Sequence, residues 1–427
     1  MGTLPRPRSL PIAPRAEPAK VRLPLAGESR PSDQRWKPIY AVWEITLRCD
    51  LACHHCGSRA GRERPDELTT DEALDLIDQM KAMDVREITL IGGEAYLRDD
   101  WTVLVRHIRD LGIMCSMTTG GRGLTPERAR AGKDAGLQAV SVSVDGMEDT
   151  HDALRGVKGS WRSAMQAIQN LHAIGMRVTA NTQIGRLNLA EIEPTFRHLV
   201  ASGIKAWQVQ LTVAMGRAAD QPALLLEPYQ LLEVMPLLGR LKRVADEAKV
   251  VVWPGNNIGY FGPFESLLKG TFPRGHMASC GAGRSTLGIE ANGDIKGCPS
   301  LPTADYVGGN VRDYPLLDIW EQAPALRFTR DRTVEDGLWG YCRTCYYADV
   351  CRAGCSWTSH VLFGKPGNNP FCHHRALELL REGKRERIVQ TAPAEGKPFD
   401  HGRFEIVLED WPEPDLAWAK KLAAEKP

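Results

Sequence analysis

Residues 40–56 read Y-A-V-W-E-I-T-L-R-C-D-L-A-C-H-H-C. The first seven residues are mostly apolar, aromatic or β-branched, which predicts a buried strand over 40–46. The loop after this strand carries three thiols, at Cys49, Cys53 and Cys56. A loop of this kind can wrap one small metal centre, either a zinc ion completed by a neighbouring histidine or an iron–sulfur cluster held by three thiolates.

The alternation of short apolar segments with amphipathic ones continues to about residue 211. It predicts strands at 40–46, 87–91, 114–118, 139–144, 177–182 and 206–211. It predicts helices near 70–83, 101–111, 126–135, 161–174 and 189–202. This order is typical of a parallel α/β fold, either an open doubly wound sheet or a partial (β/α) barrel. Both folds place their site at the carboxyl ends of the strands.

Polar residues gather at those strand ends. Alternation along the strands predicts three shared faces that line a polar cavity: Ser141 with Ser143, Thr179 with Asn181 and Gln183, and Gln208 with Gln210. By position alone, the candidate bases are Asp145, Tyr96, Gln210 and Asn256. Trp207 and Trp253 are candidate contacts for a peptide.

Seven further cysteines follow, at Cys280, Cys298, Cys342, Cys345, Cys351, Cys355 and Cys372. Seven thiols exceed one metal site, and a pair of zinc knuckles is the purely structural alternative. Because this part of the chain shows little periodicity, we expect it to be held by metal rather than by a large core. Cys115, inside the third predicted strand, is expected in the core.

Composition narrows the class of protein. The 427 residues carry 54 Lys and Arg against 53 Asp and Glu, a net charge of +1, so no overall field attracts nucleic acid or an anionic membrane. With 43% hydrophobic residues the chain is a globular protein. Neither a signal peptide nor a long apolar span is present, which predicts a cytoplasmic protein.

The spacing C-x3-C-x2-C at Cys49, Cys53 and Cys56 resembles the signature of the radical S-adenosylmethionine (SAM) superfamily. The run G-G-E at 92–94, directly after the second strand, is a second match. The resemblance implies a partial (β/α)6 TIM-like barrel and a [4Fe–4S] cluster whose fourth iron binds SAM. One departure is His55, which stands where the family usually has an aromatic residue.

The same resemblance implies a set of cofactor contacts. Gly92 and Gly93 would approach the methionyl part of SAM, and Glu94 would receive its amino group. Ser143, in S-V-D-G, and Arg155, in H-D-A-L-R-G, match further contacts. A surface ion pair is the alternative role for Arg155. The expected cofactor contacts are therefore Gly92, Gly93, Glu94, Ser143, Arg155 and Asn181.

The later cysteines, with the glycine at Gly293, resemble the SPASM domain, a small cysteine-rich iron–sulfur extension of radical SAM enzymes. The resemblance implies two auxiliary [4Fe–4S] clusters, and hence three in all. The inner cluster would use Cys280, Cys298 and Cys355. The outer cluster would use Cys342, Cys345, Cys351 and Cys372.

Proteins with this pair of domains mostly modify ribosomally made peptides. The implied activity is reductive cleavage of SAM to a 5′-deoxyadenosyl radical, which abstracts hydrogen from a precursor peptide and leads to a crosslink or similar oxidative modification. The resemblance extends to maturases associated with Nif11-type leader peptides. The implied partners are the peptide, a reductant such as flavodoxin or ferredoxin, and a separate leader-binding protein, since the 35 residues before the first strand are too few for a winged-helix module.

Three alternatives stay open from the sequence: a sulfatase-maturase-like enzyme that makes formylglycine, an iron–sulfur electron carrier, and a zinc-binding protein. The expected domain limits are a disordered tail at 1–35, a radical SAM barrel at 36–255, a linker at 256–275, a SPASM domain at 276–375 and a C-terminal extension at 376–427. Within the extension, the alternating run 403–408 predicts a docking strand.

Overall fold

The computed structural model describes residues 36–270 and 280–427. The predicted tail at 1–35 and the last part of the predicted linker, 271–275, lie outside the described residues. Residues 37–427 form one compact unit.

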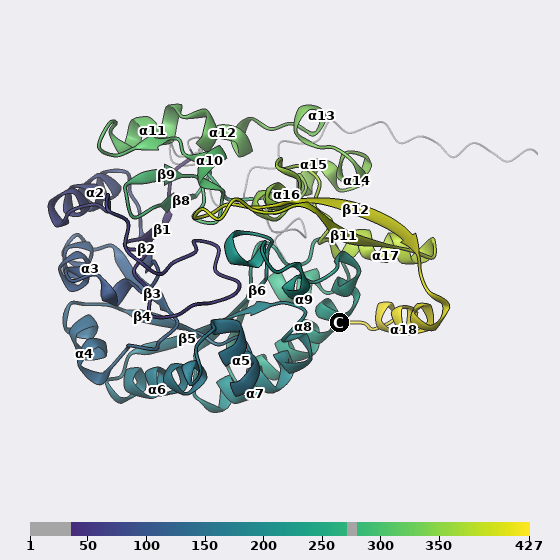
Figure 1. Cartoon of the computed structure of the whole chain (residues 1–427), viewed down its shortest axis with the longest axis horizontal. Coiled ribbons are helices and arrows are strands. Elements are labelled where there is room, and N and C mark those ends of the chain that lie inside the picture. Colours follow the sequence, from purple (N-terminus) through teal and green to yellow (C-terminus); the bar gives the residue numbers. More distant parts are fainter. Residues whose placement is uncertain (1–35, 271–279) are drawn as a thin grey trace, which may run out of the picture. The chain divides into compact units, whose positions relative to one another are not determined.

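One ten-stranded sheet forms the frame of this unit (Figure 1). Its strands are β1 (Tyr40–Glu44), β2 (Glu87–Ile91), β3 (Met114–Thr119), β4 (Ala139–Ser143), β5 (Arg177–Ile184), β6 (Ala206–Leu211), β7 (Val251–Pro254), β8 (Thr286–Ile289), β9 (Asp294–Lys296) and β10 (Gly309–Asn310). Their order is β10-β9-β8-β1-β2-β3-β4-β5-β6-β7. Strands β1 to β7 are parallel in chain order, which confirms the predicted parallel α/β fold.

Helices connect these strands and run along the outer side of the sheet (Figure 1). They are α2 (Thr70–Ala82), α3 (Trp101–Asp110), α4 (Pro126–Asp134), α5 (Glu148–Arg155), α6 (Ser160–Ala173), α7 (Ile192–Ala201), α8 (Leu231–Glu247) and α9 (Glu265–Lys269). Helix α2 shows how they attach, because Leu76, Ile77 and Met80 share one face and are fully buried in the main core. Each such side chain contributes about 1.5–3 kcal/mol through burial.

The six predicted strands and five predicted helices all occur, and their ends differ by a few residues. The fifth helix begins as a 3-10 turn at Leu189–Glu191 and becomes α-helical only at Ile192, with Pro194 tolerated in its first turn. Helix α5 and strand β7 were not predicted. Helix α5 carries four charged residues and a His in its eight positions, so it has no long apolar stripe to signal it.

The cysteine-rich segment does not stand apart from the barrel, since β8 pairs in parallel with β1. Its first half also joins the main core through Leu287, Ile289, Ile295 and Trp320. The expectation that this segment lacks a large core is therefore wrong for that half. It holds for the part around Leu338, whose buried apolar cluster is small. The domain limits drawn from the sequence stay a prediction.

The rest of the chain is made of short elements. They are α10 (Thr303–Tyr306), α11 (Leu316–Gln322), α12 (Pro324–Asp331), α13 (Val334–Gly337), α14 (Tyr341–Thr344), α15 (Ala348–Cys351), α16 (Ser356–Phe363), α17 (His373–Arg381), β11 (Lys384–Ala392), β12 (Arg403–Asp410) and α18 (Glu413–Ala423). The predicted docking strand falls within β12, but it pairs with β11 in a separate antiparallel hairpin and does not join the main sheet.

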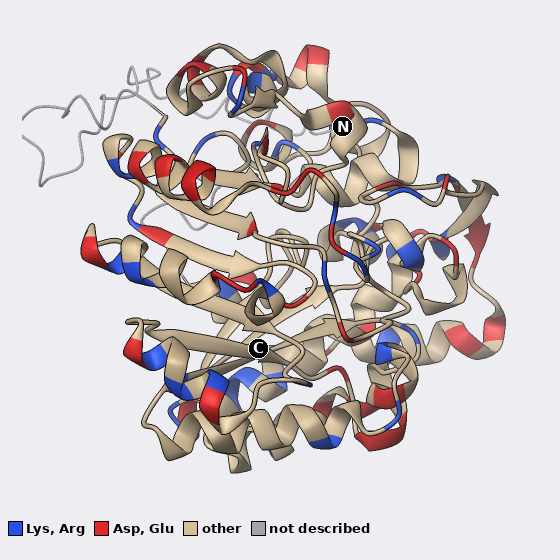
Figure 2. Cartoon of the chain, turned by 60° about the vertical axis from the view of Figure 1, so that its left-hand side comes forward, with Lys and Arg blue, Asp and Glu red and all other residues tan. Residues whose placement is uncertain are grey.

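Charge is distributed without a dominant sign. In Figure 2, basic and acidic residues are interspersed along the outer helices. No helix in the described ranges is long and apolar enough to cross a membrane.

Candidate active site

The first cysteine loop folds back along itself after β1. The Cys49 amide donates to the carbonyl of Gly61 at 3.0 Å, and the Gly61 amide donates to the carbonyl of Leu47 at 2.9 Å. Closed in this way, the loop places Cys49, Cys53 and Cys56 on the wall of one cavity of about 530 Å³. None of the three forms a disulfide. The predicted trio is thus brought together at a carboxyl end of the sheet.

The three thiols are placed to hold a metal centre. Burial raises the pKa of Cys49 and Cys53, so both thiols keep their protons until a metal centre ionises them. The zinc alternative needs a neighbouring histidine, and each of the two in this loop has one ring nitrogen in contact with another residue. His54 Nδ1 lies 2.8 Å from the amide nitrogen of Gln221, and His55 Nε2 lies 3.1 Å from a buried aspartate.

The two glycines after β2 are required by close approach of the chain. The Gly93 amide donates to the Thr46 carbonyl at 2.8 Å. A Cβ at Gly92 would lie 2.3 Å from the Thr46 oxygen, and one at Gly93 would lie 2.2 Å from the Arg48 oxygen and 2.7 Å from Cβ of Cys49. Any side chain here would therefore push the cysteine loop out of place. Both glycines also line the cavity.

Glu94 is buried at the cavity wall, and both of its oxygens are held. The Gly120 amide donates to Oε1 at 2.6 Å, and the Thr119 hydroxyl donates to Oε2. Burial raises the pKa of Glu94 to about 7. A carboxylate fixed in this way is suited to receive a cation such as the amino group of SAM, and that role stays a prediction.

Arg155 and Asp145 form a buried ion pair, with Nη2 and Oδ2 2.6 Å apart. The Arg155 Nη1 atom lies 3.7 Å from Sγ of Cys53, so the surface alternative for this arginine is wrong. Burial alone would raise the pKa of Asp145, but the nearby charges of Arg155 and His55 lower it. Nδ1 of His151 accepts the Asp145 amide at 3.1 Å, and burial beside Arg155 lowers the pKa of His151 to about 3.

Five residues of the three predicted polar faces line the cavity, whereas Ser141 and Thr179 lie outside its wall. Ser143 and Asn181 lie on its wall. Six carboxamide side chains are on the same wall: Asn181, Gln183, Gln208, Gln210, Asn256 and Asn257. Arg155 is the only Arg or Lys among the described residues that line it. The wall is therefore rich in neutral hydrogen-bonding groups and poor in positive charge.

The later cysteines divide into two groups. Cys280, Cys298 and Cys355 line the same large cavity as the first cysteine loop. A separate small pocket of about 20 Å³ is lined by Cys342, Cys345, Cys351 and Cys372. Burial raises the pKa of Cys298 and of Cys351 to about 12. These thiols are therefore protonated at neutral pH until a bound metal ionises them. This division matches the inner and outer sets implied by the resemblance, and the ligand roles stay predictions.

Four expectations about single residues are wrong. Trp207 is fully buried in the core, where its indole donates to Thr182, and Trp253 is 64% exposed and outside the cavity lining, so neither contacts a substrate there. Tyr96 is buried, with its hydroxyl accepting the amide of Gly123, and Asp145 is held in its ion pair. Gln210 and Asn256 do line the cavity, and Cys115 is buried as expected.

Glu44 and Phe399 are among the residues of the cavity wall that were not predicted. Glu44 ends β1, and burial raises its pKa to about 8. Nothing in a strand sequence marks one buried acid, although the alternation of β1 could have placed it on the inner face. Phe399 comes from the far end of the chain, and no local pattern links it to the site.

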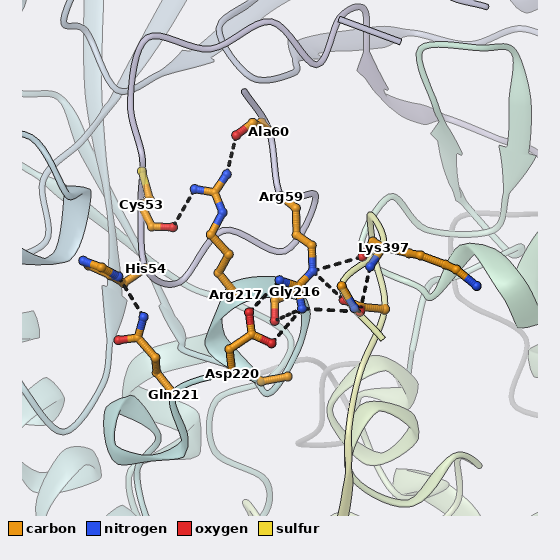
Figure 3. A network of polar contacts seen from close by, with 12 residues as sticks. Cys53, His54, Arg59, Ala60, Gly216, Arg217, Asp220, Gln221 and Lys397 are labelled. Carbon is orange, nitrogen blue, oxygen red and sulfur yellow. Dashed lines mark hydrogen bonds and ion pairs between the residues drawn. The ribbon is translucent and has the colours of Figure 1, made fainter. Parts of the chain in front are cut away.

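Phe399 belongs to a segment, 396–402, that we call the strap. The strap is bound to the first cysteine loop through Arg59, as Figure 3 shows. Arg59 Nε lies 2.8 Å from Oδ1 of Asp400, and its Nη1 lies 2.6 Å from Oδ2 of Asp220. The Phe399 amide also donates to the carbonyl of Gly57 at 3.0 Å. The strap therefore covers part of the cavity.

Comparisons with known proteins agree with this geometry. Residues 43–199 match the radical SAM superfamily, and residues 280–346 match the SPASM iron–sulfur cluster-binding domain. The chain is 31% identical over 361 residues to the AdoMet-dependent heme synthase of Nitratidesulfovibrio vulgaris, covering 79% of this chain and 93% of that protein. It is 30% identical over 357 residues to the mycofactocin maturase MftC of Mycobacterium tuberculosis, covering 81% and 86%.

Solved structures share the fold at low sequence identity. SuiB of Streptococcus suis bound to S-adenosylmethionine superposes with a TM-score of 0.61 at 16% identity, over 75% of this chain and 74% of SuiB. The enzyme anSMEcpe with bound AdoMet and a peptide superposes with a TM-score of 0.63 at 13% identity, over 80% and 95%.

Proposed function

The chain belongs to the radical SAM superfamily and carries a SPASM domain, and we propose that it modifies a ribosomally made precursor peptide, most simply by installing a crosslink or a similar oxidative change. The composition of the cavity wall carries the proposal. Five of the six carboxamides can pair with peptide N–H and C=O groups, since in the described part of the chain only Asn257 is already bonded, to the backbone of Leu211. The wall offers one arginine and no lysine among its described residues.

The sequence similarity to heme synthases favours a second candidate, a tetrapyrrole substrate. Heme carries propionate carboxylates, and proteins pair such groups with Arg or Lys. Arg155 is already committed to Asp145, which leaves no described cationic side chain of the wall for them. The relation to the mycofactocin maturase, at nearly the same identity, agrees with a peptide.

When bound, SAM and a reduced [4Fe–4S] cluster supply a 5′-deoxyadenosyl radical that removes hydrogen from an unreactive C–H bond. Cys49, Cys53 and Cys56 hold this cluster. Glu94 binds the amino group of SAM, and Ser143 and Asn181 bind the rest of the cofactor. A one-electron reductant such as flavodoxin or ferredoxin delivers the electron.

Other residues of the chain orient the reactants and exclude water. Asp145 fixes the direction of Arg155 toward the cysteine loop, because their contact at 2.6 Å is buried. The strap, with Phe399 on the cavity wall, closes one side of the cavity. Exclusion of water and fixed geometry matter because the hydrogen to be removed must lie close to the reactive carbon.

Two auxiliary [4Fe–4S] clusters complete the proposal. Cys280, Cys298 and Cys355 hold the inner one beside the substrate cavity, and the four thiols of the small pocket hold the outer one. Three clusters predict about twelve irons per chain. Leader recognition falls to the barrel, the SPASM segment, residues 376–427 or a separate leader-binding protein.

One experiment separates the candidates. Anaerobically reconstituted protein is incubated with SAM, dithionite and either a candidate precursor peptide or an iron tetrapyrrole that is not yet a porphyrin. We expect 5′-deoxyadenosine to form both when the peptide is present and when no substrate is added. We expect mass spectrometry to show a loss of two hydrogens from the peptide. A porphyrin product without any change in the peptide would overturn the proposal in favour of the second candidate.

A further inference from the structure

Two histidines and a carboxylate meet outside the cavity. Asp305 lies in α10, His360 in α16 and His401 in the strap. Oδ2 of Asp305 is 3.1 Å from Nε2 of His360 and 3.8 Å from Nε2 of His401, and the three candidate ligand atoms lie within 4.8 Å of one another. Ligands of a tetrahedral zinc ion, about 2.0–2.1 Å from the metal, are separated by roughly 3.3 Å. A small movement of the side chains would close this group around one ion.

The hydrogen bonds on the other ring nitrogens set the tautomers that metal binding needs. Nδ1 of His401 lies 2.8 Å from the carbonyl oxygen of Gly402. A carbonyl only accepts, so Nδ1 carries the proton and Nε2 of the neutral ring presents a lone pair. Nδ1 of His360 lies 2.9 Å from the hydroxyl of Tyr306, which can accept in the same way. Metal-binding histidines are usually held by such outer bonds.

Both imidazole Nε2 atoms face the same carboxylate oxygen of Asp305. A cation between them would attract the carboxylate and a ring lone pair at the same time. The site is also accessible, because the Asp305 side chain is 46% exposed while those of His360 and His401 are 5% and 11% exposed. Two buried imidazoles and one half-exposed carboxylate leave the solvent side open for entry of an ion and for a water ligand.

We propose that Asp305, His360 and His401 form a site for a divalent cation of the Zn²⁺ type, separate from the iron–sulfur centres. No cysteine belongs to it, and its three ligands do not line the cavity. Its position suggests a structural role. His401 follows Asp400, the partner of Arg59, and α16 begins directly after Cys355, so the ion ties the strap to the SPASM segment.

The test measures metal rather than turnover. Full-length protein with intact clusters is freed of loose divalent ions by a mild chelator and titrated with Zn²⁺ under anaerobic conditions. We expect one Zn²⁺ per chain and an X-ray absorption spectrum with nitrogen and oxygen ligands. Asp305→Asn and His401→Ala should each weaken Zn²⁺ binding at least tenfold. Asp305 is partly exposed, so its variant tests the site without a threat to the fold.

The matched control is His107→Gln, which removes the imidazole from an exposed pair with Asp78 and should leave Zn²⁺ binding unchanged. Addition of Zn²⁺ should slow the hydrogen exchange of residues 396–402 in the wild type. In His401→Ala, addition of Zn²⁺ should leave this exchange unchanged. Sulfur ligands in the spectrum, no bound Zn²⁺, or Zn²⁺ binding by Asp305→Asn and His401→Ala that equals that of the wild type would overturn the proposal. None of these readouts depends on the radical reaction.

Discussion

Nη2 of Arg155 lies 2.6 Å from Oδ2 of Asp145, and this buried pair holds Nη1 of the same guanidinium 3.7 Å from the thiol of Cys53. Asp145→Asn removes the charge that orients Arg155 while keeping the shape of the side chain. We expect SAM affinity to fall by about 10–100-fold, as for other residues that orient a binding group. Equilibrium dialysis with labelled SAM measures this. Asp78→Asn, in an exposed pair with His107, is the control, and equal affinity in both variants would contradict the role of Asp145.

A second prediction concerns the close approach of two loops. Gly93→Ala places a methyl group 2.2 Å from the Arg48 oxygen, and backbone on both sides must move. We expect a loss of about 1–3 kcal/mol in stability, because overpacking forces the chain apart, and a loss of about four irons as Cys49 shifts. Gly61→Ala in the same cysteine loop meets nothing within 4 Å and should keep its iron. Iron assays and thermal unfolding of both variants decide the matter.

The sequence was sufficient for the barrel because its strands are short apolar runs between caps and glycines, and periodicity reports that directly. The division of the later cysteines into two groups came from the resemblance to the SPASM domain and not from their order, because Cys355 shares a pocket with Cys280 and Cys298 although it lies between Cys351 and Cys372. Helix α5 was missed because its few apolar residues give a weak stripe. Trp207 was misjudged although alternation along β6 places it on the face opposite to Gln208 and Gln210, which line the cavity.

Contacts between distant segments were beyond prediction. Arg59 meets Asp400 across 341 positions of sequence, and nothing local to either residue signals the other. The same holds for Asp305 and His401. The parallel pairing of β1 with β8 could not be predicted from either strand either. A buried strand has the same apolar pattern whether the strand it pairs with is near or far in sequence.

Removal of the proposed outer cluster should act locally. The four cysteines of the small pocket are surrounded by a minor apolar cluster of Leu338, Ala348 and Ala353, whereas the barrel has its own large core. In the double variant Cys345→Ala/Cys351→Ala we therefore expect faster hydrogen exchange over residues 334–355 and unchanged protection in β2 to β5. Exchange read by mass spectrometry tests this. Uniform loss of protection throughout the barrel would show that the cluster supports the whole fold.

His151 predicts a specific pH dependence of stability. Its pKa is lowered from 6.5 to about 3 by burial and by the charge of Arg155, so between these values the unfolded chain binds a proton that the folded chain does not. The stability contributed by the neutral ring is complete above pH 6.5 and is lost as the pH falls toward 3, by up to about 1.4 kcal/mol per pH unit. His151→Gln keeps an acceptor for the Asp145 amide and cannot be charged. Its melting temperature should fall less than that of the wild type between pH 7.5 and 5.5, and equal falls would contradict the assignment.

The strap gives the last prediction. The Arg59 side chain is 13% exposed and lies between two carboxylates, of which Asp400 is 9% exposed. Arg59→Met removes the shared cation and leaves Asp400 buried without it, a change that costs about 3–5 kcal/mol for a fully buried pair and less for this partly exposed one. Because Asp400 also holds the amides of Gly396 and Lys397, the whole strap should loosen.

Hydrogen exchange over 396–402 should accelerate in Arg59→Met, and water should enter the cavity beside Phe399. If the strap protects the radical, as we propose, the variant should form more 5′-deoxyadenosine for each modified peptide than the wild type, since an exposed radical is consumed without product. Arg197→Met is the matched control, because it removes an exposed pair with Glu193 that contributes less than about 1 kcal/mol. A variant with a loose strap but an unchanged ratio would mean that the barrel alone shields the reaction.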